Sequence, residues 1–322
     1  MVFFDTISLF VLFGLGQCLL DFIFKHIKKK ENIPFPPYDY DFLLSLDPKK
    51  YPLYLEKIFY YETGKKLDLS CPKTFNEKIQ WLKLYDTTPL KTTLTDKILV
   101  RDWIRKQIGE EYLKPILLVC KTFDEIDFSS LPNKFIIKAN HGSKWNYKIK
   151  NKEQFLAEER LFQMVRDNFN SWLETSFFPW AGFEMQYKDI EPRIIIEELL
   201  IEGEPLIEYE IYCFNGEPQV YQKVIYSHPV ESCVYEKDFS ISDISFNSGY
   251  KIIVDPADDL LKKAVELSKV LAKEFKLVRV DWLRYDNKLY FNEMTFTPFS
   301  GMYKFSDESH NLRLGKMLNL KK

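Results

Sequence analysis

The chain has few of the residues that build metal centres and disulfide frameworks. Its 322 residues include only four histidines and five cysteines, and no two cysteines form a C-x-x-C pair. These counts exclude the usual zinc-ligand spacings, and an odd number of scattered cysteines favours a reducing, cytoplasmic compartment. The net charge is −2, from 45 Lys and Arg against 47 Asp and Glu. Without a basic excess, we expect no nucleic-acid partner.

The composition is that of a large globular protein. Hydrophobic residues make up 46% of the chain, aromatic residues 16% and charged residues 29%. Such values exclude a disordered chain, a collagen-like chain and a bundle wholly embedded in a membrane. The length predicts about two domains.

The N-terminal region, residues 1–30, combines an apolar stretch with a cluster of lysines. The uncharged run from Thr6 to Leu20 is shorter than the roughly 20 residues of a full membrane span. Its lysines follow the apolar run, whereas a signal peptide carries its positive charge before it. Two interpretations remain: a helix that spans or lies on the inner face of the membrane, or a helix packed on protein. Residues 31–73 then read as a proline-containing linker and a helical extension.

Residues 74–322 mix helical patterns with hairpin signals. Thr74 followed by Glu77 predicts a capping box that opens a helix over 74–86, and the pattern from Lys152 to Thr175 predicts one long helix. Asn215-Gly216 between two apolar runs predicts a β-hairpin. Helices interleaved with antiparallel hairpins favour an α+β fold over a doubly wound parallel sheet.

The strongest chemical signal lies in the last hairpin. Arg279 and Asp281 are two residues apart on one apolar strand and therefore share a face, which can also receive Glu293 from the next strand. Carboxylates on such strands are costly to bury unless they are paired or bind a metal. Two carboxylates together with phosphate oxygens are a common Mg²⁺ site, and a purely structural Arg–Asp pair is the alternative.

Two weaker signals lie upstream. Lys138 ends a β-type run just before the turn Asn140–Ser143, an arrangement suited to phosphate contact, although an exposed edge-strand lysine is the commoner case. Glu197–Leu200 ends a buried strand, where a hinge could bind a heterocycle, although a plain strand end has the same pattern.

In this order, the motifs resemble those of ATP-grasp proteins, and Phe75–Asp86 (FNEKIQWLKLYD) resembles the TupA-like branch associated with surface-polysaccharide biosynthesis. The resemblance covers roughly residues 74–305. The motifs that carry it are, in chain order, Asp96-Lys97, IIKANHGS ending at Ser143, PRIIIEE ending at Glu198, EYEIYCFNG from Glu208, Arg279-Val-Asp281, and NEMTFTP…G from Asn292 to Gly301.

The resemblance implies two α+β subdomains that clasp ATP, and it assigns roles by position. Phosphate contacts would come from Lys97, Lys138 and Ser143, and catalytic groups would be Arg279, Lys138 and His141. The adenine hinge would be Glu197, Glu198, Leu199 and Leu200, with Glu208 on the ribose. Mg²⁺ would be held by Asp281, Glu293 and Thr295, and the acceptor end would be shaped by Pro298, Ser300 and Gly301.

Three positions depart from the pattern of the family. The glycine-rich loop reads Gly142-Ser143-Lys144-Trp145, which puts its function as a flexible phosphate lid in question. Thr295 stands where the metal motif usually has asparagine, and Glu210 where the branch usually has lysine.

By this resemblance we expect an ATP- and Mg²⁺-dependent carboxylate–amine ligase. Its partners would be ATP, a carboxylate-bearing sugar, and a small amine or amino acid, and it would act on a surface polysaccharide or its nucleotide-sugar precursor. Two alternatives stay open: a non-catalytic nucleotide-binding module, and a glycosyltransferase or sugar-phosphate transferase of the same pathway.

Overall fold

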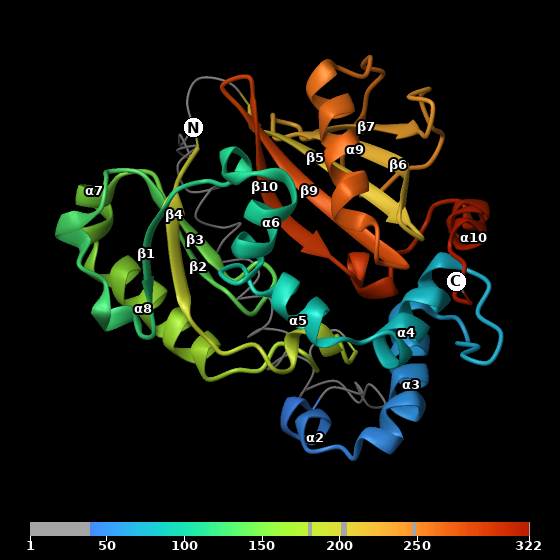
Figure 1. The fold of residues 1–322 in the computed structure, drawn as a ribbon. Helices are drawn as coiled ribbons and strands as arrows, with labels where there is room; N and C mark the ends of the chain where they lie inside the picture. The colour runs from blue at the N-terminus through green and yellow to red at the C-terminus, as the bar shows by residue number, and fades with distance from the viewer. Residues whose placement is uncertain (1–38, 180–181, 201–204, 247–248, 322) are drawn as a thin grey trace, which may run out of the picture.

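The computed structural model describes residues 39–179, 182–200, 205–246 and 249–321, which form two β-sheets and the helices around them (Figure 1). None of the helices in these ranges has both the length and the apolar character that crossing a lipid bilayer requires. The apolar segment expected at residues 1–30 lies outside the described residues.

The first sheet has four antiparallel strands in the order β1-β4-β2-β3. Its strands are β1 (Ile116–Cys120), β2 (Phe135–Ala139), β3 (Asn146–Ile149) and β4 (Ile194–Glu198). One face packs on α7 (Lys152–Ala157) and α8 (Glu159–Leu173), with Ile137, Ile196 and Phe169 in the shared core. Since side chains alternate along a strand, Lys138 and Glu197 lie on the opposite face.

The second sheet has six strands in the order β10-β9-β5-β6-β7-β8, and only the β7–β8 pair is parallel. Its strands are β5 (Ile207–Phe214), β6 (Glu217–Ile225), β7 (Glu231–Glu236), β8 (Lys251–Ile252), β9 (Leu277–Tyr285) and β10 (Lys288–Thr295). One face buries Ile211, Val280 and Trp282 against α6 (Val100–Ile108) and α9 (Asp259–Ala272). The two expected hairpins and the α+β architecture are confirmed.

Five further helices lie around and below the lower end of the second sheet in Figure 1. They are α2 (Tyr40–Leu44), α3 (Tyr51–Thr63), α4 (Phe75–Tyr85), α5 (Pro89–Thr95) and α10 (Glu308–Met317). Short 3₁₀ turns are η1 (Pro48–Lys50), η2 (Glu110–Tyr112), η3 (Phe123–Glu125), η4 (Phe128–Ser130), η5 (Met185–Tyr187) and η6 (Pro298–Gly301). The predicted capping box at the start of α4 is confirmed, with Thr74 and Glu77 bonding each other's backbone N–H.

The prediction of one helix from Lys152 to Thr175 is wrong. The chain leaves helical geometry at Glu158, where ψ is 77°, and this break separates α7 from α8. In a straight helix, Phe155 and Phe162 would lie about 10 Å apart along the axis. The break brings their rings to 5.5 Å from each other and packs both against Phe128, a tertiary contact that helical periodicity does not reveal.

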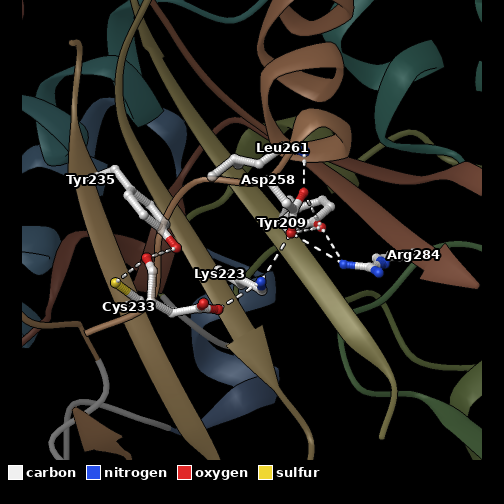
Figure 2. A network of polar contacts seen from close by, with 8 residues as sticks. Tyr209, Lys223, Cys233, Tyr235, Asp258, Leu261 and Arg284 are labelled. Carbon is white, nitrogen blue, oxygen red and sulfur yellow. Dashed lines mark hydrogen bonds and ion pairs between the residues drawn. The ribbon is translucent and has the colours of Figure 1, made fainter. Parts of the chain in front are cut away.

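A polar network fastens α9 to the second sheet, on the face turned toward this helix (Figure 2). Asp258 caps α9 by accepting the backbone N–H of Leu261 at 2.8 Å. The same carboxylate accepts the Tyr209 hydroxyl at 2.8 Å and lies 2.9 Å from the Lys223 ammonium and 3.2 Å from the Arg284 guanidinium. Hydrogen bonds from Leu261, Lys223 and Tyr209 outweigh burial and lower the pKa of Asp258. Because the network joins the start of α9 to β5, β6 and β9, its role is structural.

We expect Asp258→Ala to lower the free energy of unfolding by about 2–3 kcal/mol, since it removes a helix cap and the acceptor for Tyr209. Asp259→Ala, at the exposed first residue of the same helix, should cost under about 0.5 kcal/mol. Urea unfolding at neutral pH measures both. Because the folded-state pKa of Asp258 is lowered, its contribution is present near neutrality and is lost as the pH falls through the acid range. Equal midpoints for the two variants would contradict the assignment.

Candidate functional site

Three carboxylates stand side by side across the second sheet. Glu210 on β5 pairs in register with Asp281 on β9, and Asp281 pairs with Glu293 on β10. Glu208 lies two residues before Glu210 and shares its face. We call these four residues the acidic wall. It occupies the face of the sheet turned away from α9, and Glu208, Glu210 and Asp281 are buried.

One arginine neutralises part of this charge. Arg279 lies two residues before Asp281 on β9 and binds both of its oxygens, with Nε–Oδ1 at 2.7 Å and Nη2–Oδ2 at 2.6 Å. The same guanidinium is 3.7 Å from Glu210 and 3.7 Å from Glu293. Burial would lower the pKa of Arg279, but Asp281 and Glu210 outweigh it and raise the pKa well above the ordinary value. Four acids gather around this one cation, and burial raises the pKa of Asp281 well above its ordinary value although Arg279 opposes the shift.

The first sheet presents the opposite charge. We call Lys97, Arg101, Lys114, Lys138 and Lys148 the basic wall. Lys138 and Lys148 come from β2 and β3, on the sheet face turned away from α8. The ammonium of Lys97, just before α6, donates to the carbonyl of Gly142 at 2.6 Å.

Electrostatic interactions show that the two walls face each other. Burial would raise the pKa of Glu293, but the charges of Lys97, Arg279 and Lys138 outweigh it and leave the pKa below its ordinary value. Burial lowers the pKa of Lys148, and the charge of Glu208 opposes that shift. The two walls therefore place cations opposite carboxylates, with Lys97 and Lys138 within electrostatic reach of Glu293.

A single glutamate organises the basic wall. Glu197, at the end of β4, lies 2.7 Å from the Lys138 ammonium, 3.0 Å from that of Lys114 and 3.3 Å from the Arg101 guanidinium. Burial would raise the pKa of Glu197, yet Lys138 and Lys114 hold it well below its ordinary value. Burial, together with the charge of Lys138, lowers the pKa of Lys114 to about 8, although Glu197 opposes this. The Glu197 side chain is thus committed to the three cations.

The rest of the expected hinge follows Glu197 directly. Glu198 ends β4 and is exposed, Leu199 is buried and Leu200 is half-buried. The backbone of Leu199 and Leu200 lies beyond the last register pair of β4, which joins Glu198 to Phe135. These residues directly follow Glu197 at the edge of the basic wall, and their role as an adenine hinge stays a prediction.

His141 and Ser143 lie in the loop after β2 and are not brought into the walls. Both ring nitrogens of His141 are engaged, Nδ1 with the Asn140 side chain at 3.1 Å and Nε2 with the Trp172 carbonyl at 2.9 Å. Ser143 is exposed. Trp145 stacks on Trp172 at 5.8 Å, so this loop is fastened to α8 rather than shaped as an open glycine-rich lid.

The residues expected at the acceptor end continue from the acidic wall. Thr295, on β10, pairs in register with Arg279, and its hydroxyl donates to Glu293 at 3.3 Å. Pro298, Ser300 and Gly301 form η6, three residues beyond β10. The structure thus brings together Arg279, Asp281, Glu293 and Thr295, and it places the η6 turn at their end of the sheet.

Sequence reasoning missed Arg101 and Lys114 and treated Glu210 only as a departure from the family. Lys114 precedes the proline before β1 and Arg101 lies on α6, so neither belongs to a local motif. Alternation along β5 would have placed Glu210 on the face of Glu208. The strand pairing that sets Glu210 beside Asp281 is visible only in the folded chain.

The acidic wall suits Mg²⁺ by the chemistry of its donors, because hard carboxylate oxygens in surplus are what this ion prefers. In the described part of the chain, no three His, Cys, Asp or Glu side chains converge on one point as a metal cage does. Arg279 also engages both oxygens of Asp281. A metal held here therefore takes one or two of these carboxylates, with other oxygens supplied by a ligand.

Comparison with solved structures finds ligases at low identity. A D-alanine–D-alanine ligase from Bacillus anthracis is 17% identical, with a TM-score of 0.39, over 70% of this chain and 65% of that chain. The corresponding ligase from Helicobacter pylori is 15% identical, with a TM-score of 0.40, over 76% and 69% of the two chains. An N5-carboxyaminoimidazole synthetase from Staphylococcus aureus, complexed with ADP, is 15% identical, with a TM-score of 0.35, over 63% and 44%. This chain thus spans less than two thirds of the Bacillus anthracis ligase.

No curated protein matches the chain. The family model for TupA-like ATPgrasp matches residues 77–319. Because that match runs through both sheets and includes every residue of the acidic and basic walls, the chain belongs to the TupA-like ATP-grasp family.

Proposed function

We propose that the protein is an ATP- and Mg²⁺-dependent carboxylate–amine ligase that acts on a surface polysaccharide or its nucleotide-sugar precursor. The observation that carries the proposal is the pair of facing walls of opposite charge. Such a pair suits a nucleoside triphosphate with its divalent cation. The phosphates bind the lysines and arginine of the basic wall, and the metal binds the carboxylates of the acidic wall.

In this proposal, Lys97 and Lys138 bind the phosphates, and Glu197 holds Lys138 in place through their 2.7 Å contact. The backbone of Glu197–Leu200 receives the adenine, and Glu208 the ribose. Glu208 already accepts the Tyr226 hydroxyl at 2.6 Å and the Asn292 amide at 3.0 Å, which fixes the direction of its carboxylate.

Mg²⁺ would be held by Asp281 and Glu293, where it would neutralise charge on the transferred phosphoryl group. Arg279 binds the same phosphoryl group from its place on β9, two residues before Asp281. To do so, it must release at least one of the two Asp281 oxygens that it now engages. Arg279 thereby occupies the metal-side carboxylate in the free protein and turns toward phosphate in the complex.

The reaction assigned to this site has two steps. A substrate carboxylate takes the γ-phosphate of ATP and releases ADP, and an amine then displaces phosphate from the acyl phosphate to form an amide. The chain's residues do no covalent work in either step; they orient two anions and offset their charge. The turn Pro298–Gly301 shapes the acceptor end.

The substrates can be found by measuring ADP release from Mg·ATP across a matrix of acids and amines. The acids are glucuronate, galacturonate and their UDP conjugates, and the amines are the common amino acids and hydroxylamine. A ligase releases ADP only when acid and amine are both present. ADP release without an amine would indicate a kinase, and no release with any pair would favour the non-catalytic module.

The basic wall predicts how nucleotides bind. Lys97→Met and Lys138→Met should each raise the Kd for ADP at least tenfold, because each removes a cation that contacts phosphate, and should leave adenosine binding unchanged. Lys106→Met, at an exposed position on α6, is the control and should change neither Kd by more than twofold. Calorimetric titration measures both ligands. An equal loss of adenosine binding would move these lysines out of the phosphate site.

The acidic wall predicts the metal requirement. Asp281→Asn and Glu293→Gln should each abolish ADP formation while the protein stays folded, since each removes a charged oxygen that the Mg²⁺ assignment needs. Glu217→Gln, a half-buried carboxylate on β6 that pairs with Lys269, should retain full activity. Circular dichroism checks folding. Full activity in either wall variant would refute the metal assignment.

The chemical step predicts a label and a rate effect. ¹⁸O placed in the substrate carboxylate should appear in the released phosphate, because the amine displaces phosphate that bears one substrate oxygen. Arg279→Ala should lower kcat by roughly a hundred- to a thousandfold, or about 3–4 kcal/mol, with little change in the KM for ATP. Arg284→Ala, on the same strand but in the α9 network, is the control and should keep kcat within about threefold. Unlabelled phosphate would indicate phosphoryl transfer to another group.

A further inference from the structure

The turn at the acceptor end has an unusual backbone. Phe299 and Ser300 have φ of 52° and 53°, and Gly301 follows at 62°, so three consecutive residues are left-handed. Residues other than glycine rarely adopt this left-handed region. Such a conformation persists only where the surrounding structure enforces it. At Gly301, an added Cβ would lie 2.4 Å from the Gln80 amide nitrogen, so α4 packs directly against this turn.

Two buried side chains of α4 hold the turn. The Gln80 amide donates to the carbonyls of Ser300 at 3.0 Å and Gly301 at 2.7 Å. One turn of helix later, the Lys83 ammonium donates to the Ser300 hydroxyl at 2.7 Å. Gln80 and Lys83 are 0% and 1% exposed, so these contacts exchange with no water. A spacing of three residues places both on one face of the helix.

A buried carboxylate holds the turn from its other side. Glu184, which precedes η5, accepts hydrogen bonds from the hydroxyls of Thr297 and Ser300. Gln186 donates to the Thr297 hydroxyl at 2.7 Å. Burial lowers the pKa of Lys83 to about 7 while the charge of Glu184 opposes this, and burial raises the pKa of Glu184. Lys83 and Glu184 are therefore counter-charges with the Ser300 hydroxyl between them.

This cluster lies beside the acidic wall and contains none of its residues. Thr297 comes two residues after the end of β10. On η5, burial raises the pKa of Tyr187 well above its ordinary value, and the charges of Glu184, Glu293 and Arg279 all act on it. The Tyr187 phenol thus lies within electrostatic reach of both this cluster and the acidic wall. The cluster holds the chain just after it leaves β10.

We propose that Lys83 and Gln80 are positioning residues that hold the turn Pro298–Gly301 in the conformation that receives the carboxylate substrate. This inference rests on the proposed ligase function. It makes α4 the element that sets the acceptor side of the site, independently of the two walls that receive the nucleotide.

The test compares the turn with the nucleotide site in the full-length protein. Lys83→Met alone leaves Glu184 as an unpaired buried charge and can unfold the chain, so the main variant is Lys83→Met with Glu184→Gln, which removes both charges. Lys78→Met is the matched control. Lys78 lies on the same helix, but its ammonium donates to the carbonyls of Gly315 and Leu318 at the end of α10, at 2.7 and 2.6 Å.

Hydrogen–deuterium exchange measures the turn, and calorimetry measures the Kd for Mg·ADP. In the double variant, the amides of residues 299–302 should exchange at least tenfold faster while the Kd for Mg·ADP stays within twofold. Lys78→Met should leave exchange in the turn unchanged. Wild-type protection of the turn in the double variant would overturn the proposal. A loss of Mg·ADP affinity in step with the loss of protection would also overturn it, because that result indicates general loosening.

Turnover supplies the second readout. With the uronate that supports ADP release, the double variant should raise the KM for the acid at least tenfold and leave the KM for ATP within twofold. An equal rise in both would mean that the Lys83–Glu184 pair acts on the whole site and would overturn the proposal. If the wild-type protein binds no Mg·ADP, the ligase function fails, and the exchange result still decides whether the Lys83–Glu184 pair holds the turn.

Discussion

The contact between Arg279 and Asp281 is the interaction on which the site depends. Three strands set Glu210, Asp281 and Glu293 side by side, and like charges at that spacing on a largely buried surface oppose folding. Arg279 engages both oxygens of Asp281 and lies within 3.7 Å of the other two carboxylates, so one guanidinium makes the arrangement tolerable. It does not cancel the charge. Burial still raises the pKa of Asp281 well above its ordinary value, and a divalent cation bound here would favour the ionised carboxylate.

The basic wall follows the same rule with the signs reversed. Glu197 is a lone buried carboxylate among Arg101, Lys114 and Lys138. Its negative charge stabilises the three neighbouring cations, whose summed positive charge still exceeds that of the one carboxylate. Each sheet therefore carries one buried residue of the minority sign at the centre of its charged face. A ligand that is itself anionic and accompanied by a metal suits both walls at once.

The helices differ in whether they only support the sheets or also contact the site. α8 and α9 pack on the outer faces of the two sheets, and neither contributes to the walls. α4 is different, because its buried polar residues reach the turn that continues β10. Burying the side chains of a lysine and a glutamine costs free energy unless each of their N–H donors has an acceptor. Here the acceptors are the carbonyls and the hydroxyl of a left-handed turn, so helix and turn stabilise each other.

Much of this protein could be predicted from the sequence alone. Alternation along one strand placed Arg279 and Asp281 on one face, the Asn215-Gly216 pair predicted a hairpin, and the Thr74–Glu77 capping box located the start of α4. These are local properties, set by backbone geometry within a few residues. The order of the motifs was enough to identify the family.

Only the tertiary structure decided which distant residues meet. The register of β5 against β9 added Glu210 to the acidic wall, and the packing of α6 and the segment before β1 brought Arg101 and Lys114 to Glu197. The break at Glu158 and the burial of Lys83 against Ser300 depend on contacts more than twenty residues away along the chain. No local pattern encodes such contacts, because their energy comes from burial and charge pairing that exist only once the sheets and helices have assembled.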